Sequence, residues 1–396
     1  MRLPTFGLTL VLGWLAVSGA DASTYAFVNG KWFDGNGFTA RTVYVTDGRF
    51  AFEEPGNIDE TIDLAGKYVV PPFGESHTHT LAENPARNAE FLEQGIFYAK
   101  IQAWTVSGAA RHRAKFSGPE SVDSRIAAGG ITASDGHPMQ IGMRFLAPDA
   151  IDGEWMHIVE TREDIANKWD AVLASDTDFV KTFLINSDRY AELKADDTVT
   201  MRHRGLDPAL LPEIVRRAHA AGLKVSCHVR TAIDFRTAVA AGVDELAHLP
   251  GFAIGPGSDE EMGDARLLAE LDDPARFMVT AADARKAAKG GVVVDTTVGY
   301  RSRARSDDVS EERRKLLQKL DEARRRRAPE QPARVARGGG TSGHWLGHGR
   351  GDFTERGAVH PRTGRVRQSH PTSFVGRHHT AVDFFGAQDW PTGRRL

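Results

Sequence analysis

A His-x-His pair, His77 and His79, follows the apolar, strand-like run Tyr68-Val69-Val70 and two prolines. Side chains two residues apart in an extended segment point in the same direction, so both imidazoles can face one metal ion. Taken alone, such a pair is more often two surface histidines. Its position directly after an apolar strand and a proline break favours the metal site.

Three further residues that could take part in such a metal site lie in strand-like runs later in the chain. Lys181 lies in the apolar run 179–184, where a buried lysine would need a partner or a modification; a surface lysine on an edge strand is the alternative. His228 and His248 each end a short strand that follows a helix and a glycine. A lone strand-end histidine is usually a hydrogen-bonded polar residue, but parallel barrels gather their catalytic groups at the carboxyl ends of strands.

Two other residues lie near these positions. His137 precedes Pro138 in a loop, where it either contacts substrate or is an ordinary turn histidine. Cys227, the only cysteine of the chain, is adjacent to His228 and so points to the opposite side of its strand, as a buried structural thiol would. A single cysteine excludes an internal disulfide and any multi-cysteine zinc site.

The elements that must position these residues repeat in the order helix, glycine, strand. The predicted strands are 68–70, 179–184, 224–228, 245–249 and 292–295, and the predicted helices are 86–94, 208–221, 234–241 and 281–289. This repetition predicts βα units on a parallel sheet, and at this chain length a barrel. We expect its seventh strand within Gly291–Thr297, followed by a charged helix over Glu311–Arg327.

The N-terminal part of the sequence follows a different pattern. Short β-prone runs alternate with the turn signals Asn29-Gly30, 34–37 and Asp47-Gly48, which predict a small antiparallel sheet. Residues 1–22 combine a positive start, an apolar run at 6–17 and an Ala-x-Ala cleavage pattern. We therefore expect a signal peptide, a mature chain from Ser23, and a periplasmic or secreted protein. A membrane anchor is the alternative, although the apolar run is short for a span.

The ordered set His-x-His, Lys, His, His on successive strands resembles that of the amidohydrolase superfamily. Within it, Thr24–Leu64 and Phe91–Gln102 resemble the exported branch related to imidazolonepropionase and prolidase. The resemblance runs from about Tyr25 to Tyr300. It implies an α/β fold, namely a (β/α)8 TIM-like barrel with a small N-terminal β-sandwich. It also implies a hydrolase that cleaves the C–N bond of a cyclic or dipeptide-like amide with a metal-activated water.

The resemblance implies a role for each residue of the set. His77 and His79 would bind the more buried metal, and His228 and His248 would hold a second. Lys181, carboxylated, would bridge the two metals, which turns an awkward buried cation into an anionic ligand. Zinc is the expected metal, because nitrogen and oxygen ligands with an open position suit it.

The C-terminal region departs from this pattern. The chain as a whole has 50 basic and 53 acidic residues, a balance that argues against a dedicated nucleic-acid binder. Residues 324–396 alone hold 14 Arg, no Lys and five acids. The family's aspartate at the end of the eighth strand has no counterpart there, since Asp352, Asp383 and Asp389 end no apolar strand, and no catalytic aspartate is named.

Lysine-free, Gly- and Arg-rich sequence without periodicity is typical of a GC-rich gene read out of frame. Codons consistent with residues 328–348, shifted by one base, can encode an amphipathic helix, a glycine stop and a strand that ends in aspartate. We therefore expect a frameshift between about Arg324 and Ala328. A natural disordered basic tail is the alternative.

These observations divide the chain into a signal peptide (1–22), a β-sandwich part (23–67), an incomplete barrel with strands one to seven (68–327) and a basic, disordered tail (328–396). An unclosed barrel exposes strand edges, so we expect poor stability and little or no hydrolysis from this chain. The expected partner is a small amide, with no nucleic acid and no membrane contact after signal cleavage. A vestigial barrel and a polyanion-binding protein with a functional basic tail are the rivals. Substrate and oligomeric state stay open.

Overall fold

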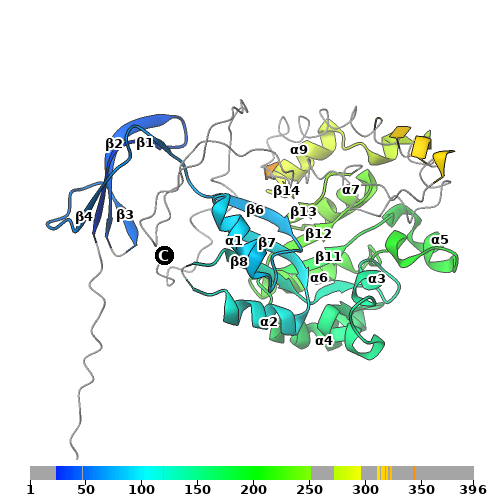
Figure 1. Cartoon of the computed structure of the whole chain (residues 1–396). Helices are drawn as coiled ribbons and strands as arrows, with labels where there is room; N and C mark the ends of the chain where they lie inside the picture. The colour runs from blue at the N-terminus through cyan, green and yellow to red at the C-terminus, as the bar shows by residue number, and fades with distance from the viewer. Residues whose placement is uncertain are drawn as a thin grey trace, which may run out of the picture. The chain divides into compact units, whose positions relative to one another are not determined.

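The computed structural model describes residues 24–46, 48–118, 120–250 and 272–295, short stretches between 310 and 322, and Ser342-Gly343. These residues belong to two units: the described part of the first ends at Val70, and the second begins at Pro71 (Figure 1). The predicted signal peptide and nearly all of the predicted tail lie outside the described residues. In the part of the chain that is described, no helix has the length and apolarity needed to cross a membrane.

The first unit is a five-stranded sheet. Its strands are β1 (Tyr25–Phe33), β2 (Phe38–Thr46), β3 (Arg49–Ala51), β4 (Glu60–Asp63) and β5 (Tyr68–Val69). The neighbours β1, β2 and β3 are antiparallel, whereas β4 and β5 both pair with β1 in parallel. The prediction of an antiparallel sheet over this region is therefore wrong for β4, because a longer connection brings it back alongside β1. Phe27, Trp32, Val43 and Leu64 lie in the core of this unit.

The predicted turn at Asn29-Gly30 is a β-bulge inside one strand. β1 continues through this pair, and its register with β2 shifts between Phe27 and Gly30. Asn29 has a φ of 56°, in the left-handed region that Asn tolerates better than most residues. A Cβ on Gly30 would come within 2.4 Å of Leu64 Cδ1 and 2.8 Å of Trp32 Nε1, so these core side chains would have to shift to admit a larger residue. The turns at 34–37 and at Gly48 connect antiparallel strands as predicted, with Asp47 itself outside the described residues.

The second unit alternates strands and helices. Its strands are β6 (Phe73–Thr78), β7 (Ile96–Trp104), β8 (Asp123–Ala128), β9 (Gly130–Thr132), β10 (Met156–Ile158), β11 (Val180–Phe183), β12 (Val225–His228), β13 (Glu245–Ala247), β14 (Val293–Asp295) and β15 (Ser342–Gly343). Its α-helices are α1 (Pro85–Glu93), α2 (Val106–Lys115), α3 (Met139–Gly142), α4 (Arg162–Ala174), α5 (Tyr190–Ala195), α6 (Leu211–Ala220), α7 (Ala232–Ala241) and α9 (Ala281–Lys289). Short helical turns are η1 (Pro148–Ala150), η2 (Ile151–Trp155), η3 (Ser187–Arg189), η4 (Met201–His203) and η5 (Pro274–Phe277).

All of these strands pair in parallel, in two sheets. One has the order β6-β7-β8 and the other the order β10-β9-β11-β12-β13-β14-β15. Only Gly129, with a φ of 66°, separates β8 from β9, so the chain passes directly from the first sheet into the second. The chain thus has a mixed α/β fold with parallel sheets, although no strand pairing among the described residues joins β15 back to β6.

Two strands differ from their predicted positions. Residues 68–69, predicted as the first strand of the parallel sheet, are β5 of the N-terminal unit, and the parallel sheet begins instead at β6, which contains His77. In the region where the sequence predicts no strand, Ser342-Gly343 pairs with Val294-Asp295 of β14. The described residues within the predicted helix Glu311–Arg327 are helical, as predicted.

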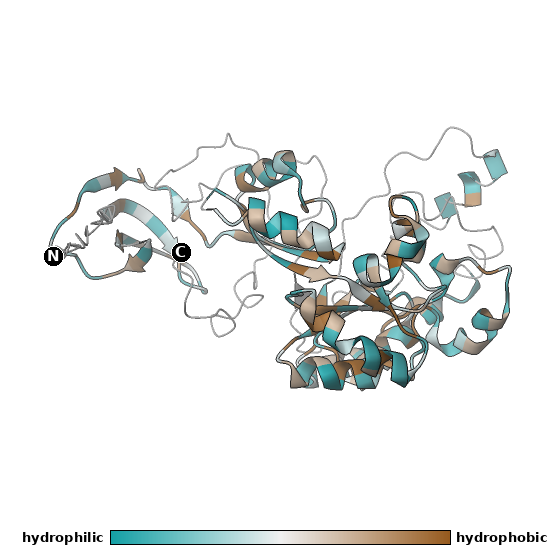
Figure 2. Cartoon of the chain, turned by 90° about the horizontal axis from the view of Figure 1, so that it is seen from below, coloured by the Kyte–Doolittle hydropathy of each residue, from teal (hydrophilic) through white to brown (hydrophobic). Residues whose placement is uncertain are grey.

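One hydrophobic core joins the larger sheet to the helices that follow its strands. Val180, Val225, Leu246 and Val294 face it from four neighbouring strands. The helices contribute Ile165, Trp169, Leu211, Ile214, Phe235 and Ala284, among others. Figure 2 shows hydrophobic colour on several of these central strands, while the helices mix polar and apolar residues. The alternate residues of the same strands point to the opposite side of the sheet.

Candidate metal centre

The strand register arranges the side chains on that opposite side in two rows. In the lower row, Lys181 of β11 lies opposite Ser226 of β12, and Ser226 lies opposite Glu245 of β13. Two residues closer to the carboxyl ends, the next row contains Phe183, His228, Ala247 and Asp295. The rows contain Lys181, Ser226, Glu245, His228 and Asp295, groups that can bind a ligand or a proton, whereas the core on the other side of the sheet is made of hydrophobic residues and Cys227.

The five histidines singled out in the sequence lie in one continuous cluster. Nε2 of His77 is 3.2 Å from Nε2 of His79. The ring of His77 lies 4.4 Å from that of His248, and the ring of His248 lies 4.7 Å from that of His228. His137, from the loop after β9, completes the series at 5.0 Å from His228. The cluster thus makes neighbours of His77 and His248, which stand 171 positions apart in the sequence.

Local backbone geometry holds two of these histidines in place. His248 has a φ of 82°, rare for a residue with a side chain, and its N–H donates to the carbonyl of Asp295 at 2.9 Å. His137 N–H donates to the carbonyl of Arg204, and Nδ1 of its ring is 2.7 Å from Nε2 of Gln140. The backbone of each histidine is thus held by a distant segment, and the ring of His137 is held by Gln140 of its own loop.

The cluster favours neutral imidazoles, the form that binds metals. Burial, reinforced by nearby cationic groups, holds the pKa values of His77, His228 and His248 well below their ordinary value. Burial also lowers the pKa of His137 to about 3. His79 reaches solvent, yet enough protein surrounds its ring that burial lowers its pKa to about 4.

Asp295 is a site residue that the sequence reasoning missed. Its carboxylate is fully buried at the end of β14, and Oδ2 lies 3.3 Å from Nδ1 of His77. Neither carboxylate oxygen, nor Nδ1 of His77, has a partner in good hydrogen-bond geometry. Burial, together with Glu245, raises the pKa of Asp295 to about 7. The signal was present, because Asp295 ends a predicted apolar strand as His228 does, but the expectation looked for an aspartate on the eighth strand.

Lys181 lies beneath the histidines and is also fully buried. Its Nζ donates to Oε1 of Gln102 at 3.1 Å and lies 3.5 Å from Oγ of Ser226. Burial lowers its pKa to about 8, so the amine loses its proton more readily than an ordinary lysine. The alternative of a surface lysine on an edge strand is excluded, since β11 lies between β9 and β12.

The donor set fits a divalent metal of the zinc type in its chemistry. It offers neutral imidazole nitrogens and a carboxylate, and three of its buried polar atoms, Nδ1 of His77 and both carboxylate oxygens of Asp295, lack a partner. Within the described ranges, however, no group of three or more His, Cys, Asp or Glu residues could hold a metal ion as it stands. A complete set of ligands therefore needs a further ligand, which a carboxylated Lys181 would supply. Cys227 does not take part, because it is buried in the hydrophobic core and burial raises the pKa of its thiol to about 11.

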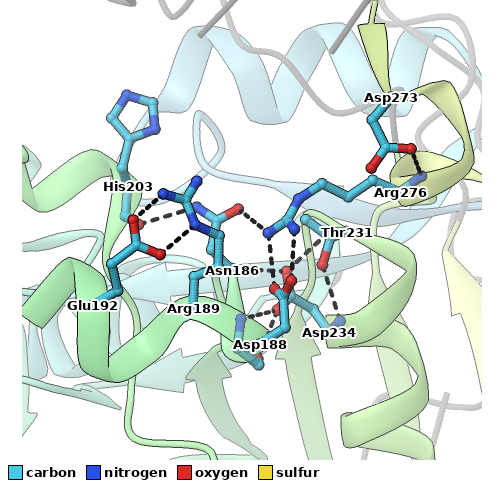
Figure 3. Close-up of polar contacts among 10 residues, drawn as sticks. Asn186, Asp188, Arg189, Glu192, His203, Thr231, Asp234, Asp273 and Arg276 are labelled. Atoms are coloured by element: carbon cyan, nitrogen blue, oxygen red, sulfur yellow. Dashed lines mark hydrogen bonds and ion pairs between the residues drawn. The ribbon is translucent and has the colours of Figure 1, made fainter. Parts of the chain in front are cut away.

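Asp234 joins the loops that follow β11 and β12 (Figure 3). This buried carboxylate accepts hydrogen bonds from the backbone N–H groups of Asn186 and Ser187, at 3.1 and 2.8 Å, and from the hydroxyl of Ser187. It also accepts from the N–H groups of Arg230 and Thr231, at the start of α7. Because Lys181 and His228 precede these loops, Asp234 fixes the two strand ends relative to each other.

Arg276 fastens the same loop from η5. Its guanidinium binds both carboxylate oxygens of Asp188, at 2.5 and 2.8 Å, and donates to Oδ1 of Asn186 at 3.2 Å (Figure 3). A planar, bidentate pair of this kind has well-defined geometry. The segment after β11 is therefore held against both α7 and η5.

Comparison with known proteins bears on the fold. No known family model matches the chain. Uncharacterized proteins of Mycobacterium tuberculosis and Mycobacterium bovis are 39% identical over 83 residues, which is 18% of this chain and 14% of each relative. The chain thus matches only a small part of the length of these curated relatives.

Solved structures match most of the chain. An amidohydrolase is 16% identical with a TM-score of 0.56, and the match covers 82% of this chain and 79% of that one. A prolidase complexed with N-methylphosphonate-L-proline gives the same identity and TM-score, with 82% and 78% covered. The ochratoxinase of A. niger is 14% identical with a TM-score of 0.54, covering 81% and 75%. The chain has the α/β fold with parallel sheets that these amidohydrolases share.

Proposed function

We propose that this protein is a metal-dependent amidohydrolase that cleaves the C–N bond of a small amide. The observation that carries the proposal is the histidine cluster, in which five rings from four segments meet near the carboxyl ends of parallel strands. The fold supports it, because proteins described as an amidohydrolase and a prolidase share it. A bound pair of divalent ions, with zinc as the expected metal, would supply an activated water and polarise the amide carbonyl.

His77 and His79 would hold one ion through Nε2, and His228 and His248 the other. Carboxylated Lys181, in the row beneath, would bridge them. With the ions bound and Asp295 ionised, its carboxylate, 3.3 Å from Nδ1 of His77, would favour the tautomer that carries the proton on Nδ1 and leaves Nε2 free as a ligand. His137, whose ring lies beside that of His228 and outside the proposed ligand set, would contact the substrate.

The proposal includes the finer expectations from the sequence. These are kinship with the exported imidazolonepropionase- and prolidase-related branch, export to the periplasm or medium after removal of residues 1–22, and a frameshift near Arg324–Ala328. The amide would be cyclic or dipeptide-like, as in that branch. The chain as written would then hydrolyse its substrate poorly, because the residues that should complete the sheet are read in the wrong frame.

Metal content tests the proposal on the full chain. After removal of metal with a chelator and addition of zinc, we expect about two ions per chain by elemental analysis. His77→Ala should lower zinc affinity by at least ~10-fold, because it removes a ligand and leaves Asp295 without its neighbour. His219→Ala is the matched control, since His219 pairs with Asp244 away from the cluster. A wild-type chain that takes up no zinc would instead support the vestigial barrel.

A further inference from the structure

The side-chain amide of Gln102, on β7, has only one orientation that satisfies its neighbours. Nε2 lies 2.9 Å from the carbonyl oxygen of Ser76 and 2.8 Å from Oε1 of Glu245. Both neighbours are acceptors, so the NH₂ group must face them. Oε1 is therefore directed at Nζ of Lys181, 3.1 Å away, and Oγ of Ser226, 3.0 Å away.

The groups that fix this orientation are themselves satisfied. Oε1 of Glu245 accepts from Gln102, and Oε2 pairs with Nζ of Lys100. Oγ of Ser226 lies 3.0 Å from Oε1 of Glu245 and 3.0 Å from Oε1 of Gln102, and its single proton serves one of them at a time. Burial raises the pKa of Glu245, but the charge of Lys100 and the hydrogen bonds lower it by more. The pKa of Glu245 therefore lies below its ordinary value, and the side chain is an anion. Its charge is balanced by Lys100, which leaves no unpaired negative charge next to a modified Lys181. Buried networks that are fully satisfied are rigid.

Lysine carboxylation would leave a single donor on this nitrogen. The neutral amine adds to the carbon of CO₂ and one N–H proton passes to solvent, which gives a planar N-carboxylate with one remaining N–H. Gln102 Oε1 is the nearest acceptor for that N–H, since Ser226 Oγ is farther away at 3.5 Å. The N–H and the carboxylate of this planar group lie on different sides of Nζ. When the N–H points at Gln102, the carboxylate therefore points away from Gln102. Nζ already reaches toward the upper row, 5.7 Å from the ring centre of Phe183, which neighbours His228.

We propose that Gln102 is a positioning residue that sets the rotation of a carboxylated Lys181, so that its carboxylate faces the histidine cluster. This inference rests on the proposed function, because it presupposes the carboxylated lysine. Ser226 assists by holding the carbonyl end of Gln102 toward Lys181. Neither residue contacts the metal or the substrate. Their effect is to remove the alternative rotations in which the carboxylate would point away from the histidines.

The test uses the full chain as wild type, Gln102→Met, Ser226→Ala and the matched control Gln94→Met, whose side chain contacts only Glu90 on α1 among the hydrogen bonds described. Each protein is loaded with zinc and ¹³C-bicarbonate. The ¹³C carbamate signal per chain and the zinc affinity against a competing chelator are measured, with folding checked by circular dichroism. Gln102→Met removes the acceptor at nearly constant side-chain length. We expect its zinc affinity to fall ~10-fold or more and its carbamate signal to fall with it.

Ser226→Ala should give a smaller loss of both, and Gln94→Met none. A folded Gln102→Met protein with wild-type carbamate and zinc affinity overturns the inference. If that variant does not fold, Ser226→Ala decides in the same way. A wild-type chain that binds two zinc ions without a carbamate signal overturns the inference but leaves the metal site standing. A wild-type chain that gives the carbamate signal but binds no zinc overturns the metal site. The loss of that signal in Gln102→Met then still supports the inference.

Discussion

Both ring nitrogens of His77 lie next to groups of the candidate centre. Nε2 faces His79, and Nδ1 faces the carboxylate of Asp295, whose oxygens have no hydrogen-bond partner. A buried carboxylate without a donor is costly when charged. In the absence of metal, the protein therefore keeps Asp295 protonated up to a higher pH than usual.

This arrangement predicts a pH-dependent stability that Asp295→Asn removes. The folded-state pKa of Asp295 is about 7 and its ordinary value is 3.8, so the folded state binds more protons in between. The free energy of unfolding must therefore fall as pH rises from about 4 to beyond 7, by an amount on the order of 3 kcal/mol at pH 8. In metal-free protein, Asp295→Asn should gain stability relative to wild type between pH 5 and pH 8, as measured by urea unfolding.

The buried histidines act in the opposite sense, because their lowered pKa values destabilise the fold as pH falls below about 6.5. They are present in both proteins, so their effect largely cancels in the difference. Asp170→Asn on the exposed face of α4 is the control and should give no pH-dependent difference. A difference between Asp295→Asn and wild type that stays constant over this pH range would contradict the prediction.

At this scale, the order of the residues along the chain singled out the histidines and Lys181 but not the polar groups between them. Each of these residues taken alone has an ordinary structural explanation, and it was the resemblance of the ordered set His-x-His, Lys, His, His to a known family that grouped them. Gln102 and Glu245 stand inside strands, where a polar residue usually faces solvent. Their inward direction follows from the register of neighbouring strands, which a single sequence does not contain.

At the scale of elements, the start of α7 has a second role besides beginning a helix. Thr231 and Asp234 form a capping box, and the Asp234 carboxylate also binds Asn186 and Ser187 from the loop after β11. The start of the helix thereby fixes a neighbouring loop. Asn186, with a φ of 56°, is the point where that loop turns away from the strand.

Asp234→Ala should loosen this loop more than it disturbs the helix. Five donors would lose their acceptor inside the protein, which we expect to lower the free energy of unfolding by on the order of 3 kcal/mol. Hydrogen–deuterium exchange at the amides of Asn186 and Ser187 should become faster. Asp207→Ala is the control, because the Asp207 carboxylate accepts a local bond from Ala209 N–H. Unchanged exchange at 186–187 would show that the loop is held by Arg276 instead.

Element boundaries were predictable where local signals agree. The helices predicted at 208–221 and 234–241 are α6 and α7 within three residues at each end, and glycines with positive φ follow both. β7 was not predicted as a strand, because inward-facing Lys100 and Gln102 break its apolar pattern. The parallel pairing of β4 and β5 depends on contacts across 35 or more residues, which no local pattern encodes.

At the scale of the whole molecule, the larger sheet ends in a two-residue strand. β15 pairs with β14 at the position where an eighth strand would follow the seventh, but only Ser342 and Gly343 are described there. The shifted reading frame places a glycine stop and an apolar strand ending in aspartate in the same region. Through these two described residues, β15 pairs with Val294 and Asp295, two of the three residues of β14.

The frameshift hypothesis therefore predicts a gain of stability when the frame is restored. Resequencing the coding DNA across Arg324–Ala328 should reveal an extra or missing base, and a chain expressed in the shifted frame should unfold cooperatively at a higher temperature. A rise of about 10 °C corresponds to several kcal/mol for a domain of this size. The chain expressed in the shifted frame should also hydrolyse amides faster, in a zinc-dependent assay, than the chain with the present C-terminal sequence. A confirmed present frame, together with a restored chain that is no more stable, would mean that the basic C-terminal region is native to this protein.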